Sequence, residues 1–227
     1  MSYILCIESA TKMCSVALFN SGTLIDFKEI GGIYSHAENL AAFVEELMQR
    51  NQLEYSALKA IAISKGPGSY TGLRIGVSLA KGLAFSLSLP LLAIDSLKSM
   101  AWAACQKKQN EDSYYCPMID ARRMEVYNAV YDKDLKKIQA ISATVIDENS
   151  FNELLQEKKV YFFGDGADKC KNSLKHPNAI FIEILSSARY MGALAEKALQ
   201  EGKTEDIAYF EPFYLKDFIA NKPKKLV

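Results

Sequence analysis

A glycine-rich stretch between two predicted elements is the first candidate for chemistry. Residues 66–76 read Gly-Pro-Gly-Ser-Tyr-Thr-Gly-Leu-Arg-Ile-Gly and join a predicted buried strand, 60–64, to a predicted helix, 71–87. Gly66 and Gly68 permit backbone angles that other residues avoid, and such a turn can aim the N–H groups of a helix N-terminus at an anion. The stretch is neither a P-loop, which needs Gly-Lys-Ser/Thr, nor a dinucleotide fingerprint, because its glycines are spaced G-x-G-x-x-x-G. Anion binding and a purely structural turn both stay open.

Two further turns carry residue types that can hold a phosphate. One follows a predicted apolar strand at residues 3–8, and the other follows a predicted strand at residues 160–163. Phosphotransferases with a strand–turn–strand layout normally place an aspartate at the first turn to position a metal through its oxygens; here the acid is Glu8, which is one methylene longer. A structural turn is the alternative in both places. With the glycine stretch, the candidate phosphate-binding residues are Glu8, Ser9, Thr11, Gly66, Gly68, Gly164 and Gly166.

The sequence predicts no metal site and no catalytic residues. Its two histidines, His36 and His176, lie far apart, and the position four residues after His36 is Leu40, so the pair that binds zinc on one helix face is missing. The five cysteines lack C-x-x-C spacing. No Ser/His/Asp or Cys/His arrangement is legible. Residues 120–123, Asp-Ala-Arg-Arg, are interpreted as a loop held by an internal ion pair.

The predicted helix over residues 71–87 is apolar on almost every side. Its only charged residues are Arg74 and Lys81. Small residues recur along a second face, and they would let the backbone of another helix approach closely. These small residues are Gly72, Gly76 and Ala80. Because one sheet cannot cover a helix that is apolar nearly all round, a partner surface is implied.

Composition places the chain among ordinary globular proteins. It has 227 residues, 49% of them hydrophobic, and 27 basic residues balance 27 acidic ones. A chain that held nucleic acid alone would need a basic surface, but the one basic cluster is the segment Lys222–Lys225, so any nucleic acid is expected to be held by a partner. Charges, glycine and proline interrupt the most apolar span, so no membrane association is expected. Cysteine usage and the absence of a signal peptide predict a cytoplasmic location.

One order of elements occurs twice along the chain. Predicted strands at 3–8, 14–20 and 23–30, a helix at 35–50, a strand at 60–64, the helix at 71–87, a strand at 91–94 and a helix at 96–107 with Ser96 as N-cap form the first half. Strands at 114–119, 125–131 and 138–146, a helix at 150–156, a strand at 160–163, a short helix after the turn at 164–166, a strand at 179–182 and a long helix from 186 to 199 form the second. The polar stretch 107–112 is the boundary candidate. We therefore predict one domain from residues 1–106 plus 205–227 and another from residues 107–204.

Several segments together resemble one protein family over essentially the whole chain. They are Ile7–Thr11, Cys14–Leu18, Ser35–Leu40, Gly66–Gly76, Ile119–Arg122 and Pro212–Leu215. The family is TsaB, also called YeaZ, the bacterial partner subunit in threonylcarbamoyladenosine synthesis on tRNA. The glycine segment is the most specific of the matches. The main departure is Glu8, where the family usually carries aspartate.

The resemblance implies an α/β fold of the actin/Hsp70/sugar-kinase type (ASKHA, ribonuclease H-like), made of two duplicated β-β-β-α-β-α halves. It implies a subunit without catalysis of its own. In the family, the related subunit TsaD carries the metal and modifies tRNAs that read codons starting with A, and the ATPase TsaE joins the complex. TsaB binds TsaD through its first two helices, here 35–50 and 71–87, and the same surface forms homodimers. The implied interface residues are His36, Leu40, Phe43, Leu47, Gly72, Ile75, Gly76, Leu79, Ala80 and Leu83.

Two other functions compete with the scaffold role. An ATP-dependent phosphotransferase would use Glu8, Thr11 and the turns at Gly66 and Gly164, and would bind ATP with magnesium. A metallopeptidase would bind a metal stoichiometrically, and the missing histidine pair argues against it. No cofactor is expected with certainty, and the phosphate-binding turns allow weak binding of ATP or ADP.

Overall fold

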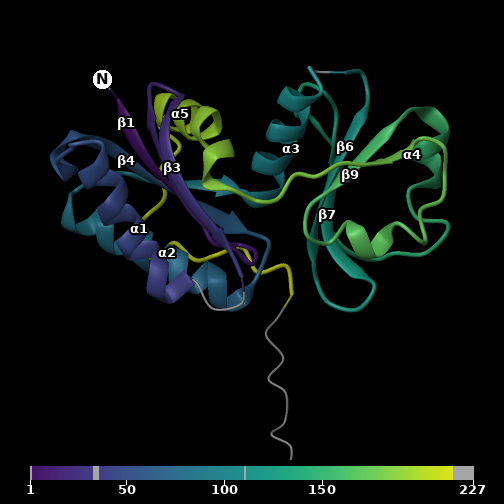
Figure 1. Cartoon of the computed structure of the whole chain (residues 1–227), viewed down its shortest axis with the longest axis horizontal. Helices are drawn as coiled ribbons and strands as arrows, with labels where there is room; N and C mark the ends of the chain where they lie inside the picture. Colours follow the sequence, from purple (N-terminus) through teal and green to yellow (C-terminus); the bar gives the residue numbers. More distant parts are fainter. Residues whose placement is uncertain (1, 33–35, 110, 217–227) are drawn as a thin grey trace, which may run out of the picture.

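The computed structural model describes residues 2–32, 36–109 and 111–216, which form two lobes, each built on a five-stranded sheet (Figure 1). The strands are β1 (Tyr3–Glu8), β2 (Met13–Asn20), β3 (Thr23–Gly31), β4 (Leu58–Gly66), β5 (Leu91–Asp95), β6 (Tyr114–Asp120), β7 (Glu125–Tyr131), β8 (Lys137–Val145), β9 (Val160–Phe163) and β10 (Ala179–Phe181). The α-helices are α1 (His36–Arg50), α2 (Tyr70–Ser86), α3 (Ser96–Lys107), α4 (Asn152–Glu157) and α5 (Gly192–Gln200). Short 3-10 turns are η1 (Tyr55–Ala57), η2 (Asp168–Cys170) and η3 (Ala188–Tyr190).

The two sheets repeat one pattern of strand pairing. In the first, β1 pairs antiparallel with β2 and parallel with β4, while β3 and β5 pair on the outer sides. In the second, β6 pairs in the same way with β7 and β9, while β8 and β10 lie on the outer sides. The strand orders are therefore β3-β2-β1-β4-β5 and β8-β7-β6-β9-β10. The predicted duplication of the chain into two similar halves is confirmed.

Strand β1 shows why its sequence is apolar at every position. Leu5 and Ile7 contact the core that α1 and α2 cover, whereas Ile4 and Cys6 contact the core on the opposite face of the sheet. That second core includes residues of η3 and α5. Because helices cover both faces, side chains pointing either way are buried, and a continuous apolar run replaces the alternation of a half-exposed strand.

Packing does not follow the predicted domain boundaries at residues 106/107 and 204/205. Helix α3, which lies before the first boundary except for its last residue, buries Leu97 and Met100 in the core of the second sheet. Helix α5, before the second boundary, buries Ala195 in the core of the first sheet. Figure 1 shows α3 between the two sheets and α5 beside the first one. The boundaries stay a prediction, and one helix of each predicted domain packs against the sheet of the other domain.

The long helix predicted over residues 186–199 is wrong. The structure instead has the short turn η3, followed by α5 from residue 192. Ser187 ends the extended segment and accepts a hydrogen bond from the Arg189 N–H. Gly192 then lies so close to Phe19 that a Cβ atom would be 2.0 Å from the ring. Contact with the first sheet, which sequence periodicity does not report, sets the start of this helix.

The N-cap of α3 is Asp95, not Ser96 as predicted. The Asp95 carboxylate accepts a hydrogen bond of 3.0 Å from the Lys98 N–H. We expect Asp95→Ala to lower the free energy of unfolding by about 1 kcal/mol, because one N–H at the start of α3 loses its acceptor. Urea unfolding would measure this change. Asp95→Asn keeps an oxygen acceptor and should restore most of the loss, so equal losses in both variants would contradict a capping role.

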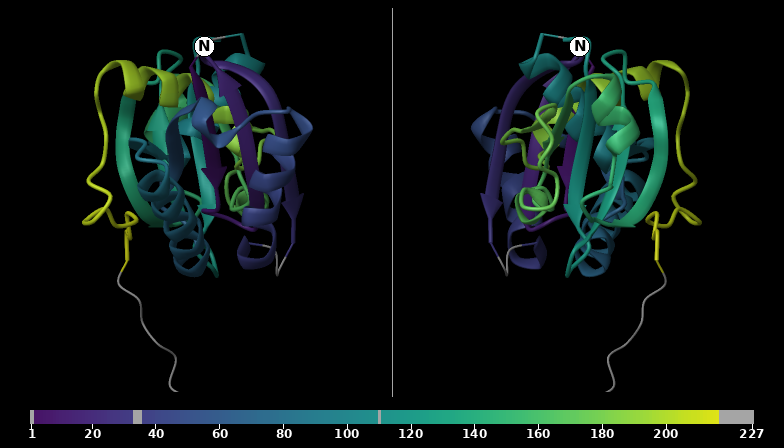
Figure 2. Two further views of the ribbon diagram at one scale, coloured as in Figure 1. Left: turned by 90° about the vertical axis from the view of Figure 1, so that its left-hand side faces the viewer. Right: turned by 90° about the vertical axis from the view of Figure 1, so that its right-hand side faces the viewer.

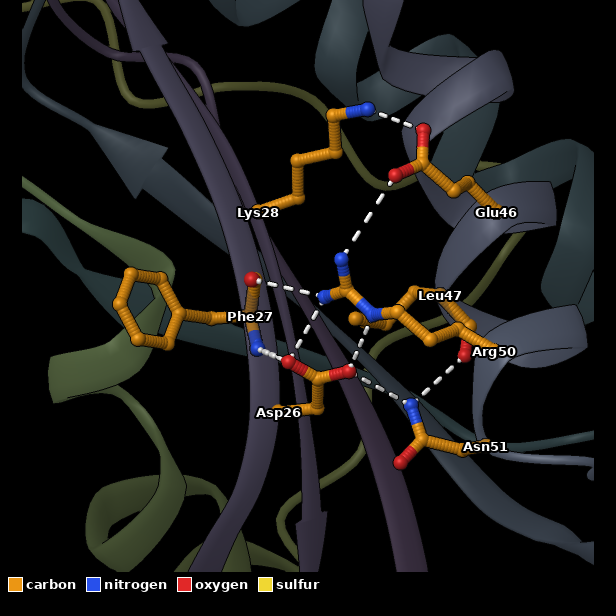
Figure 3. A network of polar contacts seen from close by, with 7 residues as sticks. All are labelled: Asp26, Phe27, Lys28, Glu46, Leu47, Arg50 and Asn51. Atoms are coloured by element: carbon orange, nitrogen blue, oxygen red, sulfur yellow. Dashed lines mark hydrogen bonds and ion pairs between the residues drawn. The ribbon is translucent and has the colours of Figure 1, made fainter.

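A polar network ties the edge of the first sheet to α1 (Figure 3). The Arg50 guanidinium donates two hydrogen bonds of 2.7 Å to the Asp26 carboxylate on β3, and Asn51 donates a third of 2.9 Å. Lys28 and Glu46 form an ion pair beside it. Burial alone would raise the pKa of Asp26, but the bonds from Arg50 and Asn51 hold that pKa below its usual value. The network therefore fixes one side of α1 against β3.

The C-terminal segment returns along the first lobe and ends near the second (Figure 2). The Glu205 N–H donates to a carbonyl of β5, and the Phe213 N–H donates to a carbonyl near the end of β4, at 2.7 Å. Lys216 then forms an ion pair of 2.5 Å with Glu125 at the start of β7. Residues 214–216 consequently lie at the junction of the two lobes.

Candidate functional site

The small residues of α2 face the interior of the protein. Gly72, Gly76 and Ala80 are buried. A Cβ atom on Gly76 would lie 2.1 Å from the Ser9 Oγ, and one on Gly72 would lie 2.3 Å from the Ser9 carbonyl oxygen. These residues let α2 approach the turn after β1. Their predicted contact with a partner helix is therefore wrong, because the helix has two uncharged faces and its spacing does not say which one points inward.

Helix α1 requires a similar correction. Leu40, Phe43 and Leu47 are buried, with 1%, 6% and 0% of their surface exposed, and they belong to the core of the first lobe. They hold α1 on its own sheet and are not available to a partner. His36 begins α1, but its side chain lies outside the described part of the structure. Of the predicted interface residues with described side chains, those that reach the surface are Ile75, Leu79 and Leu83, each half-buried.

One exposed side of α2 is nevertheless uncharged. On α2, exposed Ser78, Gly82 and Ser86 lie on the same side as Ile75 and Leu79. No atom lies within 4 Å of the position that a Gly82 Cβ would occupy. A fully open glycine within a helix costs about 1 kcal/mol relative to alanine. This outward row of small residues was not predictable from the sequence, because the inward row has the same spacing.

A groove of about 620 Å³ runs between α1 and α2. Val44 and Met48 of α1 meet Leu79 and Leu83 of α2 along it. Polar and charged side chains gather near the end of α1 and the loop that follows. These are Glu45, Gln49, Gln52 and Glu54. The face thus combines an apolar centre with a polar rim, which is the usual composition of a protein–protein interface.

The predicted phosphate-binding turns contact each other through their backbones. The Ser69 N–H donates to the Ala10 carbonyl at 2.6 Å, and a Cβ atom on Gly68 would lie 2.2 Å from the same oxygen. The second lobe repeats this arrangement: the Gly166 N–H donates to the Met118 carbonyl, and a Cβ on Gly164 would lie 2.1 Å from it. Gly66 has a φ of +106° and Gly164 one of +107°. In the first lobe, the glycine turn after β4 thus packs against the turn that follows β1. In the second lobe, the glycine turn after β9 packs against the end of β6.

Glu8 lies beneath the surface of this junction. Its side chain is fully buried, its Oε1 accepts a hydrogen bond of 2.6 Å from the Ala10 N–H, and its Oε2 has no partner among the described residues. Burial raises the pKa of Glu8 to about 7, against the opposing effect of hydrogen bonds from Ala10 and Ser64. Thr11 is also turned away from solvent, with its Oγ1 at 2.5 Å from the Ser186 Oγ. The Ser9 Oγ has no partner in the part of the chain that the structure describes.

A cleft of about 1310 Å³ separates the two lobes. The first lobe contributes the start of α2 and the turn after β1, the second contributes the β6–β7 turn, and the C-terminal segment contributes residues 214–216. Of the candidate phosphate-binding residues, Thr11 and Gly68 line the cleft. The internal ion pair predicted for residues 120–123 is wrong, because Asp120 pairs with Lys169. Phosphate binding by the predicted set stays a prediction.

Two features are absent from the described part of the chain. No helix among residues 2–32, 36–109 and 111–216 is long and apolar enough to cross a membrane. In the same part of the chain, no group of three or more His, Cys, Asp or Glu side chains could hold a metal ion.

Comparison with known proteins identifies relatives along most of the chain. The family model described as TsaD, tRNA N6-adenosine threonylcarbamoyltransferase, matches residues 25–224. The tRNA threonylcarbamoyladenosine biosynthesis protein TsaB of Escherichia coli is 31% identical over 96% of both chains. The protein of the same name from Haemophilus influenzae is 28% identical over 96% of this chain and 95% of its own.

Solved structures agree with these relatives. YeaZ from Pseudomonas aeruginosa superposes with a TM-score of 0.83 at 27% identity, covering 95% of this chain and 100% of that one. The activator of 2-hydroxyisocaproyl-CoA dehydratase from Clostridium difficile has a TM-score of 0.53 at 8% identity, which is a likeness of fold alone. The predicted ASKHA-type α/β fold is confirmed. With a duplicated fold and a matching relative along almost its whole length, the chain belongs to the TsaB (YeaZ) family.

Proposed function

We propose that this protein is a non-catalytic partner subunit in the synthesis of N6-threonylcarbamoyladenosine on tRNAs that read codons starting with A. It binds a TsaD-like catalytic subunit through the outer face of α1 and α2, works in the cytoplasm with a TsaE-like ATPase, and reaches tRNA indirectly through the complex. Alone, it pairs with a second copy through the same face. The observation that carries the proposal is the groove between α1 and α2, together with the exposed, uncharged side of α2 on which Gly82 lies.

The family match supports a partner of related fold. The model that matches residues 25–224 describes TsaD, so a TsaD chain and this one share an architecture. Two related chains can present the same helices to each other around an approximate two-fold axis, as two identical chains do around an exact one. A homodimer and a heterodimer through one face are therefore alternatives that exclude each other.

The phosphotransferase alternative has less support. It requires the Glu8 carboxylate to reach a metal-bound phosphate in the cleft. Glu8 is fully buried and is not among the residues that line the cleft. Its raised pKa also favours the neutral acid, which is a poorer ligand for a cation than the carboxylate.

Gly82→Glu tests the interface, because it adds a charge to the proposed contact face of α2 without touching the core. We expect light scattering to show a wild-type homodimer that becomes a 1:1 heterodimer on mixing with the same organism's TsaD-like protein. Gly82→Glu should weaken both associations at least tenfold, about 1.4 kcal/mol, because a charge would be buried without a partner. Gln139→Glu adds the same charge to an exposed strand of the second lobe and should behave as wild type. A wild-type monomer that ignores the TsaD-like protein would contradict the proposal, and so would equal losses in both variants.

A further inference from the structure

Two aromatic side chains of the first lobe are almost fully exposed to solvent. Of the aromatic side chains that the structure describes, Tyr209 and Phe85 are the most exposed, at 84% and 77%, and Phe213 follows at 39%. Phe85 lies in the last turn of α2, and Tyr209 lies in the C-terminal segment that passes beside α2 (Figure 1). Exposed apolar surface that is gathered in one place marks a contact with another molecule.

The two rings belong to one surface. Lys81 of α2 donates hydrogen bonds of 3.2 Å and 3.1 Å to the backbone carbonyls on either side of Tyr209, so Tyr209 lies beside this lysine. Phe85 follows Lys81 by four residues and Gly82 by three, so it lies one helical turn from both. Together, Phe85 and Tyr209 form an aromatic patch next to the uncharged side of α2.

A fixed turn presents Tyr209. The Asp206 carboxylate accepts a hydrogen bond of 2.8 Å from the Ala208 N–H and one of 3.3 Å from the Tyr209 N–H. Ile207 and Phe210, on either side, pack against the core of the first lobe. The segment therefore buries the apolar side chains around Tyr209 and leaves its ring outside. A ring that is held in place before binding loses little conformational entropy when a partner covers it.

Acidic side chains without ion-pair partners surround the aromatic patch. Three of them lie within four residues of Tyr209 and form no ion pair with any described residue. They are Glu205, Asp206 and Glu211. The basic side chains of this region are already engaged: Lys81 donates to backbone carbonyls, and Lys203 forms an ion pair of 2.7 Å with Glu201. Arg74 donates to the Tyr214 hydroxyl. The surface therefore keeps an excess of negative charge, which repels phosphate and attracts a cationic group.

Aromatic rings beside carboxylates suit the side chain of arginine or lysine. The rings attract the cation through their faces, and the carboxylates neutralise its charge. The chain already makes the ring contact once, because the Arg74 guanidinium lies 4.3 Å from the centre of the Tyr70 ring. The patch therefore predicts a partner surface that carries basic side chains among apolar ones.

A second copy of this chain offers few free cations for such a contact. Beside the α1–α2 face, Arg50 is bound to Asp26, and Lys28 is bound to Glu46. Bringing these side chains to the patch of another copy would first break both ion pairs. A different subunit with free basic side chains therefore fits the patch better than a second copy does.

We propose that the aromatic patch and its acids bind an arginine- or lysine-bearing surface of the TsaD-like subunit, and that this contact favours the heterodimer over the homodimer. The contact rests on the proposed function, because its partner is the one that α1 and α2 bind. It deepens that function by naming the side chains that select this partner. Phe85 and Tyr209 supply the buried ring surface, while Glu205 and Glu211 supply the charge.

Affinity measurements on the full-length protein test the role of the rings. Phe85→Ser/Tyr209→Ser should weaken binding to the same organism's TsaD-like protein at least about tenfold, and should change the homodimer dissociation constant by less than about twofold. Phe85→Leu/Tyr209→Phe keeps the apolar bulk and should restore most of the affinity. Val145→Ser/Leu185→Ser removes exposed apolar side chains from the second lobe and is the matched control.

The acids have a readout of their own. Glu205→Gln/Glu211→Gln should lower the affinity for the TsaD-like protein at low salt and make that affinity less dependent on salt, because salt screens the attraction between exposed charges. Glu148→Gln/Glu153→Gln removes the same charge from exposed sites of the second lobe and should keep the wild-type salt dependence.

The pattern of losses separates this contact from the partner-binding function. If Gly82→Glu weakens the heterodimer and Phe85→Ser/Tyr209→Ser does not, the function stands and the aromatic contact is wrong. Equal weakening of homodimer and heterodimer by the serine variant would contradict selection of the partner, and so would an equal loss in the matched control. A wild-type protein that does not bind the TsaD-like protein would overturn the function and the contact together.

Discussion

Replacing Gly76 by alanine is expected to cost about 3 kcal/mol of the free energy of unfolding, although the position is in the middle of a helix. The added Cβ would lie 2.1 Å from the Ser9 Oγ and 2.9 Å from the Ser9 Cβ. Ser9 is fully buried in the turn after β1, and Ile63 closes the other side at 3.2 Å. Overpacking of this kind usually costs about 1–3 kcal/mol. The cost should lie near the upper limit here, because α2 and the turn after β1 would have to move apart. Leucine at this position should prevent folding.

The same helix contains its own control. Gly82→Ala places a Cβ where nothing lies within 4 Å, and it should raise the free energy of unfolding by about 1 kcal/mol through helix propensity. Two identical substitutions, six positions apart, should therefore shift urea unfolding midpoints in opposite directions. If Gly76→Ala were as stable as wild type, α2 would not be seated on the turn after β1. If it lost binding to a TsaD-like protein while remaining stable, the small residues would face a partner as the sequence first suggested.

The contrast between these glycines shows how far the sequence could be interpreted. Strands and their duplication were predictable because buried strands are short apolar runs separated by turns, and this signal is local. The direction in which α2 faces was not predictable. Gly72, Gly76 and Ala80 make one uncharged row, and Ser78, Gly82 and Ser86 make another with the same period. Only contact with Ser9, in a distant part of the chain, distinguishes the two.

The cleft was beyond sequence reasoning for a similar reason. Its lining comes from the turn after β1, the start of α2, the β6–β7 turn and the C-terminal segment. Asp120 and the neighbouring arginines looked like an internal ion pair because opposite charges two or three residues apart often meet in a turn. The structure pairs Asp120 with Lys169, 49 residues away, which leaves Arg122 and Arg123 without a partner among the described residues. An ion pair with a residue far away in the sequence therefore determines which charged side chains of this turn stay unpaired.

Replacing Glu8 by glutamine is expected to remove a marked dependence of stability on pH. The folded-state pKa of Glu8 is about 7, against 4.5 for the ordinary group, because burial disfavours the carboxylate. Between these values the folded protein binds more protons than the unfolded chain, so the free energy of unfolding falls as the pH rises. The stabilising effect of the neutral acid is complete below pH 4.5 and is lost through pH 7. At 1.36 kcal/mol per pKa unit, the full difference is about 3 kcal/mol.

Urea unfolding of wild type and Glu8→Gln at pH 5 and at pH 8 would measure this effect. Glutamine keeps an oxygen for the Ala10 N–H and cannot ionise, so the variant should be close to wild type at pH 5 and more stable at pH 8. Other titrating groups are present in both proteins, so the difference between the two reports Glu8 together with its interaction with Asp165. If wild type and Glu8→Gln differed in stability by the same amount at pH 5 and at pH 8, the Glu8 carboxylate would already be ionised in the folded protein at pH 5. That outcome would restore the phosphotransferase alternative, because an ionised Glu8 is what a metal-bound phosphate requires. A Glu8→Gln variant that is more stable than wild type at pH 8 and still binds a TsaD-like protein would instead show that Glu8 is a buried neutral acid beneath α2. It would then not act as a metal ligand.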